Sequence, residues 1–258
     1  MLLPTLVAIV AAGAPAQQPE VTHLTPEDVR HGELTAEHYK DAVLISVDLQ
    51  EIPHVTVREE HVPESHRAQG VDAADVNAAN DYLFESAMPN AARIVKHCRA
   101  LGMPVVLVHW GYRFKDAMDL DPVTRAVFLE QFGEDWERWP HHIDHPTSRP
   151  AEVLDPQPTD YIIAKTAQDA FTSSNIDFVL KNLGAKTLIL MGGHTNGCLQ
   201  QTGQSAVEHG YETICIADAT WDFAESHRLR GIKRVDYDIV CTTEDVLAID
   251  PEQEAQED

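Results

Sequence analysis

The stretch Ile189-Leu-Met-Gly-Gly-His-Thr-Asn-Gly-Cys198 joins an apolar run to a glycine-rich turn that ends in a cysteine. Residues 187–191 are β-branched or aliphatic, which is typical of a buried strand, and residues 199–209 are compatible with a helix. A strand, a tight turn and a helix in this order place a side chain at the carboxyl edge of a parallel sheet. The helix N-terminus there favours a thiolate and lowers the pKa of a thiol. The segment predicts a nucleophilic Cys198, although taken alone it also fits a small buried apolar residue.

Two charged residues end other predicted strands. Asp48 closes the apolar run 42–47, and Lys165 closes the run 161–164. Because the carboxyl ends of strands in an open α/β sheet face one crevice, we expect both side chains to approach Cys198. Cleavage of an amide by a cysteine requires a base, a positive charge that favours thiolate, and the nucleophile itself.

Six predicted strands alternate with helical segments along the chain of 258 residues. The strands are expected at 42–47, 105–109, 161–164, 188–191, 213–217 and 238–241, and helices at 88–101, 174–182, 199–209 and 226–231. This alternation predicts an α/β fold of three layers, doubly wound, with a mainly parallel sheet of about six strands. We expect one catalytic domain over 41–248, preceded by an extension over 17–40 and followed by an acidic tail over 249–258.

Four motifs together give the chain a family resemblance. They are Val47-Asp48-Leu-Gln50, Lys165-Thr-Ala-Gln-Asp-Ala-Phe171, Gly192-Gly-His-Thr-Asn-Gly-Cys198 and Thr213-Ile-Cys-Ile-Ala-Asp-Ala219. In order and spacing they resemble the isochorismatase-like cysteine hydrolases, which include nicotinamidases, N-carbamoylsarcosine amidohydrolases, ureidoacrylate hydrolases and biuret hydrolases. The resemblance extends over residues 41–247 and implies the isochorismatase-like hydrolase fold.

The resemblance implies a catalytic triad of Asp48, Lys165 and Cys198. Asp48 is expected to move the proton, Lys165 to stabilise the thiolate, and Cys198 to form the acyl-enzyme. Backbone N–H groups of His194 and Cys198 are implied as the oxyanion hole, and the Gly193-His194 peptide is expected to be cis.

The resemblance also implies that Gln50 lines the substrate pocket, with Phe171 and Trp110 as apolar walls. Core packing is an equal alternative for each aromatic residue. His109 follows the second strand without the Asp-x-His-x-x-His spacing of nicotinamidases, which disfavours a nicotinamidase. The presence of Cys198 favours C–N cleavage over hydrolysis of a vinyl ether. No cofactor is implied.

Two segments are predicted to form long loops. Residues 51–85 and 136–145 lack a clear period, and loops of such length in a compact domain are usually functional. The second segment contains His141, His142 and His145. Imidazole is a common metal ligand, so these residues form either a metal site or, because their spacing is irregular, a polar lid over the pocket.

Residues 1–16 resemble a secretory signal peptide that ends in Ala14-Pro-Ala16. The expected location is the periplasm or the exterior, with no membrane association after processing. A start codon placed too far upstream, which gives a cytoplasmic protein, and an N-terminal anchor are the alternatives. The apolar run 2–14 is shorter than a typical membrane span.

The chain carries 19 Lys and Arg against 42 Asp and Glu, a formal charge of −23. Nucleic acid is disfavoured as a partner because phosphate binding needs clustered cations. Cys98, Cys215 and Cys241 fall within predicted helices or strands and are expected to be buried free thiols. The resemblance implies a homo-oligomer.

These observations predict a cysteine-dependent hydrolase that cleaves a C–N bond of a small amide, ureide or carbamoyl compound. The reaction is expected to pass through a thioester at Cys198. The alternative is a protein of the same fold that binds a small molecule without hydrolysing it, with Cys198 as a ligand contact or redox sensor.

Overall fold

The computed structural model describes residues 24–135 and 139–249. The predicted signal peptide (1–16) and the acidic tail from residue 250 onward lie outside this range. No helix within the described residues is long and apolar enough to cross a membrane.

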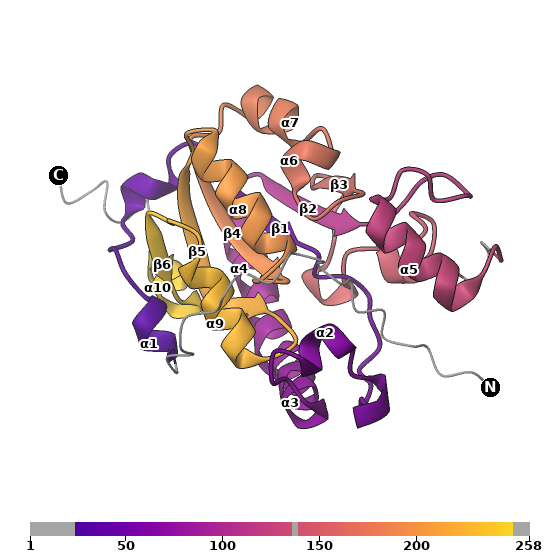
Figure 1. Cartoon of the computed structure of the whole chain (residues 1–258). Coiled ribbons are helices and arrows are strands. Elements are labelled where there is room, and N and C mark those ends of the chain that lie inside the picture. Colours follow the sequence, from indigo (N-terminus) through magenta and orange to yellow (C-terminus); the bar gives the residue numbers. More distant parts are fainter. Residues whose placement is uncertain (1–23, 136–138, 250–258) are drawn as a thin grey trace.

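Six parallel strands form a single sheet in the order β3-β2-β1-β4-β5-β6 (Figure 1). The strands are β1 (Ala42–Val47), β2 (Val105–Trp110), β3 (Tyr161–Lys165), β4 (Thr187–Gly193), β5 (Glu212–Trp221) and β6 (Ile239–Cys241). The predicted α/β fold is confirmed, with strand limits that differ by a few residues. This order reverses between β1 and β4, and ligands of doubly wound sheets bind at such a switch point, beyond the carboxyl ends of the strands.

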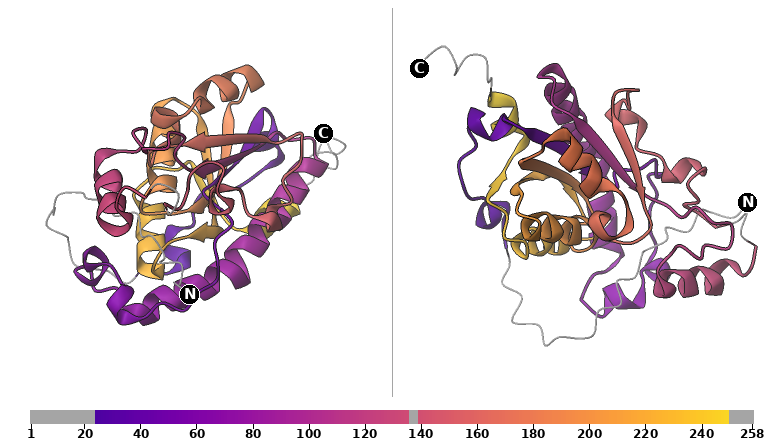
Figure 2. Two further views of the ribbon diagram at one scale, coloured as in Figure 1. Left: turned by 90° about the vertical axis from the view of Figure 1, so that its right-hand side faces the viewer. Right: turned by 90° about the horizontal axis from the view of Figure 1, so that it is seen from above.

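Helices cover both faces of the sheet (Figures 1 and 2). One face packs against α4 (Met88–Ala100) and α10 (Thr243–Ala248). The other packs against α6 (Ala170–Ser173), α7 (Ile176–Leu183), α8 (Cys198–Glu208) and α9 (Glu225–Lys233). Side chains of β1 alternate between the two apolar clusters, which explains why the whole strand is buried and why all its residues except Ser46 are apolar.

The prediction of a loop over residues 51–85 is wrong for the second half of that segment. That part forms α2 (Glu64–Arg67), α3 (Ala73–Tyr82) and a π-helical turn, η3 (Leu83–Ala87), that continues into α4. Asp72 caps α3, because its Oδ1 accepts hydrogen bonds from the amides of Ala74 and Asp75 at 2.8 and 3.0 Å. The segment mixes Ala, Asp and Asn, so it lacks the apolar period by which a helix is predicted.

An excursion between β2 and β3 carries a helix that the sequence pattern did not predict, α5 (Pro122–Phe132). It begins with Asp121 as N-cap and a proline in its first turn. Trp110, Tyr112, Phe128 and Trp139 form a small apolar cluster beneath it, separate from the two main clusters. The excursion stands beside the sheet in Figure 1, at the end where β2 finishes.

The residues before β1 pack onto the opposite edge of the sheet. α1 (Pro26–Val29) buries Val29 among residues of α9, and η1 (Ala36–Tyr39) lies just before β1. His31 exchanges backbone hydrogen bonds with Val240 of β6 at 3.2 and 2.9 Å. Residues 24–40, which were predicted as an extension, therefore pack onto the same sheet and core as the rest of the described chain.

Candidate active site

Three predicted catalytic residues lie at the carboxyl ends of three parallel strands. Asp48 directly follows β1, Lys165 is the last residue of β3, and Cys198 is the first residue of α8, after the turn that ends β4. β1 and β4 are neighbours at the point where the strand order reverses. The topology therefore delivers the thiol and the carboxylate to the same side of the switch point.

Asp48 and Lys165 form a buried ion pair. Their Oδ2 and Nζ atoms are 2.7 Å apart, and the side chains are 8% and 0% exposed. Asp48 has a positive φ of 53°, and its amide donates to the carbonyl of Val108 at 2.9 Å, which fixes the turn after β1. Among the described residues Asp48 Oδ1 has no hydrogen-bond partner although it is buried. One carboxylate oxygen thus holds the ammonium group, and the other keeps a lone pair for a proton.

Cys198 is buried beside this pair, with 3% of its surface exposed. Burial raises the pKa of its thiol to about 12; the Lys165 charge lowers that pKa, and the Asp48 charge raises it. The expectation of a lowered thiol pKa at the helix N-terminus is therefore wrong, because desolvation outweighs the helix dipole at this position. Cys198 is therefore a protonated thiol beside the ion pair of Asp48 and Lys165.

Lys165 stays protonated in this environment. Burial lowers its pKa, but the charge of Asp48 and the hydrogen bonds to Asp48 and Cys198 raise it by more, and the net shift is upward. Lys165 Nζ also donates to the carbonyl of Ala167 at 3.0 Å. The positive charge is consequently available to a thiolate throughout the neutral pH range.

A simple alkylation experiment tests the protonation state of Cys198. With a pKa of about 12, the thiolate fraction at pH 7 is more than about a thousandfold below that of an ordinary cysteine. We expect iodoacetamide to modify Cys198 slowly at pH 7 and faster at each higher pH up to at least 9. Mass spectrometry of the Cys198 peptide gives the rate of modification at each pH. An inflection of that rate below pH 7 would contradict the assignment of a protonated thiol.

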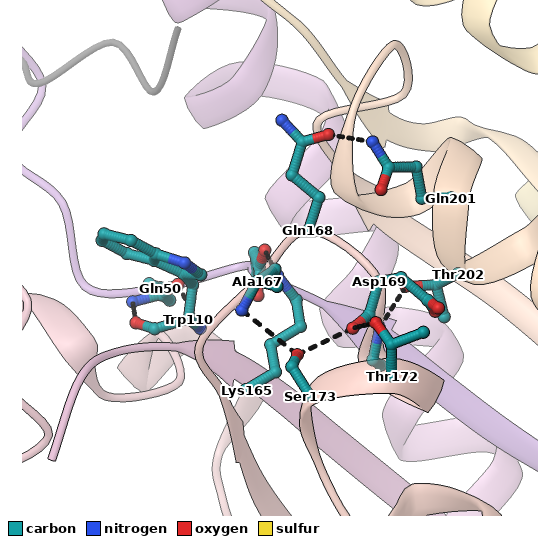
Figure 3. Close-up of polar contacts among 12 residues, drawn as sticks. Gln50, Trp110, Lys165, Ala167, Gln168, Asp169, Thr172, Ser173, Gln201 and Thr202 are labelled. Carbon is teal, nitrogen blue, oxygen red and sulfur yellow. Dashed lines mark hydrogen bonds and ion pairs between the residues drawn. The ribbon is translucent and has the colours of Figure 1, made fainter. Parts of the chain in front are cut away.

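A set of hydrogen bonds fixes the segment that follows Lys165 (Figure 3). The amide of Ala167 donates to Ser173 Oγ at 3.1 Å, and Ser173 Oγ donates to the carbonyl of Asp169 at 2.7 Å. Asp169 Oδ2 accepts from Ser205 of α8 at 2.9 Å. The segment after β3 is thereby tied to the helix that carries Cys198, so the ammonium and the thiol are fixed relative to each other.

The turn between β4 and α8 carries the predicted oxyanion hole. Gly192 has a φ of 110°, and a Cβ there would collide with the backbone of Val47, so glycine is required. The Gly193-His194 peptide is cis, as expected. The His194 ring lies against Trp221 and Phe223, with centroids 4.2 and 4.3 Å apart. Burial lowers the pKa of His194 to about 3, so its side chain is a neutral packing group.

Asp222 is a site residue that the sequence reasoning missed. Its Oδ2 accepts hydrogen bonds from Thr195 Oγ1 at 3.1 Å and from the amide of Asn196 at 2.6 Å. Its Oδ1 accepts from the amide of Phe223 at 2.8 Å. Asp222 directly follows β5, so the rule that found Asp48 and Lys165, a charge at the end of an apolar strand, could have found it.

We expect a dependence on pH from Asp222. Burial raises its pKa to about 6, and the hydrogen bonds from Asn196, Phe223 and Thr195 partly offset this. Its ionised form accepts all three donors, so protonation as the pH falls below about 6 weakens the turn that holds His194 and Cys198. Asp222→Asn should lower kcat/KM by about tenfold to a hundredfold at pH 7.5, since hydrogen bonds to charged groups are worth about 1.5–3 kcal/mol. The decline of kcat/KM near pH 6 should then disappear from the profile, and an unchanged decline would count against this role.

The other predicted pocket residues, Gln50 and Trp110, make different kinds of contact. Gln50 is buried near the site, where its Oε1 accepts from the amide of Trp110 at 2.9 Å and its Nε2 donates to the carbonyls of Trp110 and Thr147 at 3.1 and 2.8 Å. Its amide therefore braces the backbone (Figure 3). The Trp110 ring packs against Phe128 of α5, 6.0 Å between centroids.

Phe171 does not reach the catalytic residues. Its ring stacks on His209 with centroids 4.7 Å apart. His209 follows the last turn of α8, about 16 Å along the helix from Cys198. Phe171 therefore does not form a pocket wall but packs at the far end of α8. Core packing was the alternative prediction for this residue.

The three histidines of the second predicted loop have separate partners. The backbone of His141 accepts from the amide of Tyr112, His142 Nε2 bonds the carbonyl of Arg113 at 3.1 Å, and His145 Nδ1 bonds Thr147 Oγ1 at 2.8 Å. Within the described part of the chain, no group of three or more His, Cys, Asp and Glu residues is placed to hold a metal ion.

The remaining cysteines are buried free thiols, as predicted. Cys98 lies in α4, Cys215 in β5 and Cys241 in β6. Burial raises the pKa of each thiol, as it does for Cys198, but neither Asp48 nor Lys165 acts on any of the three.

Comparison with known proteins agrees with this geometry. A ureidoacrylate amidohydrolase of Variovorax paradoxus is 26% identical over 242 residues, 84% of this chain and 82% of that protein. Several further curated relatives match over 30% to 63% of their own length.

Two solved structures share the fold. A cysteine hydrolase from Pseudomonas syringae pv. phaseolicola superimposes with a TM-score of 0.62 at 18% identity, covering 88% of this chain and 97% of that one. An N-carbamoylsarcosine amidase from Thermoplasma acidophilum gives a TM-score of 0.56 at 20% identity, covering 79% of this chain and 96% of that one. The family model of the isochorismatase domain matches residues 43–245. The chain belongs to the isochorismatase family of hydrolases.

Proposed function

We propose that this protein is a cysteine-dependent amidohydrolase that cleaves a C–N bond, other than a peptide bond, in a small amide, ureide or carbamoyl compound. The observation that carries the proposal is the buried ion pair of Asp48 and Lys165, 2.7 Å long, beside the thiol of Cys198. A buried carboxylate with one unpartnered oxygen is costly to keep, and its use as a proton acceptor accounts for that cost.

The first half of the reaction forms a thioester. Cys198 Sγ attacks the carbonyl carbon of the substrate while its proton passes to Asp48 Oδ1. Lys165 favours the negative charge that develops on sulfur, and backbone N–H groups of His194 and Cys198 hold the oxyanion. The C–N bond then breaks, and the leaving nitrogen takes the proton from Asp48.

The second half returns the enzyme to its resting state. Water attacks the thioester carbon and gives its proton to Asp48. The C–S bond breaks, the carboxylic or carbamic acid leaves, and Cys198 recovers a proton from Asp48. Because the thiol starts protonated, the transfer to Asp48 accompanies the attack.

The relatives support the choice of amide chemistry. One is named a ureidoacrylate amidohydrolase and another a maleamate amidohydrolase, each of which acts on a small acyclic amide or ureide. The net charge of −23 leaves a small molecule, and not a nucleic acid, as the expected substrate.

The test is ammonia release from a panel of small amides, ureides and carbamoyl compounds, measured with the purified chain and with Cys198→Ala. Release by the first and none by the second supports the proposal. Absence of release across the panel, together with a Cys198 shown to be free and a ligand that raises the Tm, would replace it with a binding or sensing protein.

A further inference from the structure

A glycine in the middle of α9 lies against the turn that joins β4 to α8. The helix follows β5 at the carboxyl edge of the sheet (Figure 1). A Cβ on Gly231 would collide with the carbonyl of Thr195 and would lie 2.6 Å from the amide nitrogen of Asn196. These are backbone atoms, which cannot swing aside as the end of a side chain can. Alanine is the better helix former, so the contact with the turn, and not the helix itself, requires glycine here.

The turn that α9 contacts carries the proposed oxyanion hole. Thr195 and Asn196 lie between His194 and Cys198, whose backbone N–H groups are proposed to hold the oxyanion. The sheet fixes one side of the turn, because the amide of Thr195 donates to the carbonyl of Trp221 in β5 at 3.0 Å. A displacement of Thr195 and Asn196 would therefore move the N–H groups on either side of them.

Two more residues on the same face of α9 contact this turn or the carboxylate that holds it. His227, Gly231 and Arg234 are spaced i, i+4 and i+7, which places them on one face of the helix and its C-cap. Arg234 Nη1 donates to Asn196 Oδ1 at 2.7 Å. His227 is 2% exposed, and its Nδ1 lies 4.0 Å from Oδ1 of Asp222, the carboxylate that accepts from the Asn196 amide. One face of α9 therefore follows the turn and its anchor.

We infer that Gly231 and Arg234 are positioning residues for the oxyanion hole. By contacting residues 195–196 they set the direction of the N–H groups of His194 and Cys198. Hydrogen-bond donors stabilise a developing oxyanion only when they are aimed at it before the reaction, and a displacement of about 1 Å can lower the rate about a hundredfold. The inference rests on the thioester step of the proposed function, because an oxyanion forms only when the thiol attacks a carbonyl.

Two probes of the same thiol separate the oxyanion hole from the nucleophile. With p-nitrophenyl acetate, Cys198 Sγ attacks the carbonyl carbon, its proton passes to Asp48, the C–O bond breaks, and 4-nitrophenolate leaves with the bonding electrons. This acylation passes through an oxyanion and needs no particular amide substrate. Alkylation by iodoacetamide is a displacement at a saturated carbon, so it forms no oxyanion and reports on the thiol alone. The rate of Cys198→Ala is subtracted from each.

The variants are Gly231→Ala, Arg234→Met and Arg234→Lys, with Lys233→Met as the matched control. Lys233 is the neighbouring cation on α9, and its Nζ donates to the carbonyl of Asp28 in α1 at 3.1 Å. Each variant is purified as the full chain. Its Tm, its rate of acylation and its rate of alkylation are measured on one preparation.

We expect acylation to slow about a hundredfold in Gly231→Ala, because the added methyl group displaces the turn. Arg234→Met should slow acylation about threefold to tenfold, the usual effect of losing one hydrogen bond. Arg234→Lys keeps a donor and should recover part of that loss. Alkylation should keep its wild-type rate in all three variants, and Lys233→Met should change neither rate.

Two results would overturn the inference. Equal losses of acylation and alkylation would show that α9 only supports the fold around Cys198. Unchanged acylation in both Gly231→Ala and Arg234→Met would show that the oxyanion hole does not depend on α9. If Gly231→Ala does not fold, the comparison of Arg234→Met with Lys233→Met decides alone.

Failure of the inference is distinguishable from failure of the proposed function. If acylation slows in the variants while the wild-type protein releases no ammonia from any amide, the amidohydrolase is refuted and the positioning role stands. Cys198-dependent ammonia release together with unchanged acylation gives the reverse. A wild-type protein without Cys198-dependent acylation has no functional oxyanion hole, and the inference is then refuted.

Discussion

Cys198→Ala should reduce ammonia release by at least about 10⁴-fold, to the limit of detection, while the protein keeps its fold. The expected loss is large because the sulfur makes the covalent bond of the reaction, and no other described cysteine can replace it. Cys98, Cys215 and Cys241 are buried in a helix and two strands, and neither Asp48 nor Lys165 acts on their thiols. Measured Tm and circular dichroism of the variant establish that the loss is chemical.

Cys198→Ser is the sharper variant of the same experiment. The hydroxyl has a similar shape, but its higher pKa makes the proton harder to transfer to Asp48. We expect it to lose nearly as much activity as the alanine variant and to accumulate no acyl-enzyme. In the wild-type protein, rapid quenching followed by mass spectrometry should show the acyl group on the Cys198 peptide. A variant with alanine at this position that still turned over would refute the thioester.

The core of the fold could be predicted because it depends on short-range patterns. A strand of a doubly covered parallel sheet is mostly apolar, as the run 42–47 is apart from Ser46, and such strands are followed by helices with their own period. The same regularity located Asp48, Lys165 and Cys198, since charged or reactive residues at strand ends meet at one edge. Their approach in the structure follows from topology alone.

The rest could not be predicted, because it depends on tertiary contacts. α3 is stabilised by the Asp72 cap and by packing of Val76, without an apolar period of its own. The pKa of Cys198 depends on how completely the site is desolvated, which no local pattern reports. The contact between the residues that follow β2 and the segment 139–150, through the hydrogen bond from the Tyr112 amide to the His141 carbonyl, joins parts of the chain whose sequence showed only irregularly spaced histidines.

The ion pair at the centre of the site gives the second large effect, in which stability and activity separate. Asp48→Asn leaves the ammonium of Lys165 buried without its counter-charge. Lys165→Met likewise leaves the carboxylate of Asp48 buried without its counter-charge. Each single substitution should lower the free energy of unfolding by about 3–5 kcal/mol, because the uncompensated buried charge, more than the lost attraction, is destabilising.

The double variant Asp48→Asn/Lys165→Met should recover much of that loss, because neither charge remains, whereas independent sites would give the sum of the two single effects. Its activity should not recover: all three variants should lose at least about 10³-fold in kcat/KM, since each lacks the proton acceptor or the charge that favours thiolate. Urea unfolding and ammonia release on the same preparations measure both quantities. Activity that returned along with stability would mean that the pair only holds the site together, whereas a stable and inactive double variant assigns it to the chemistry.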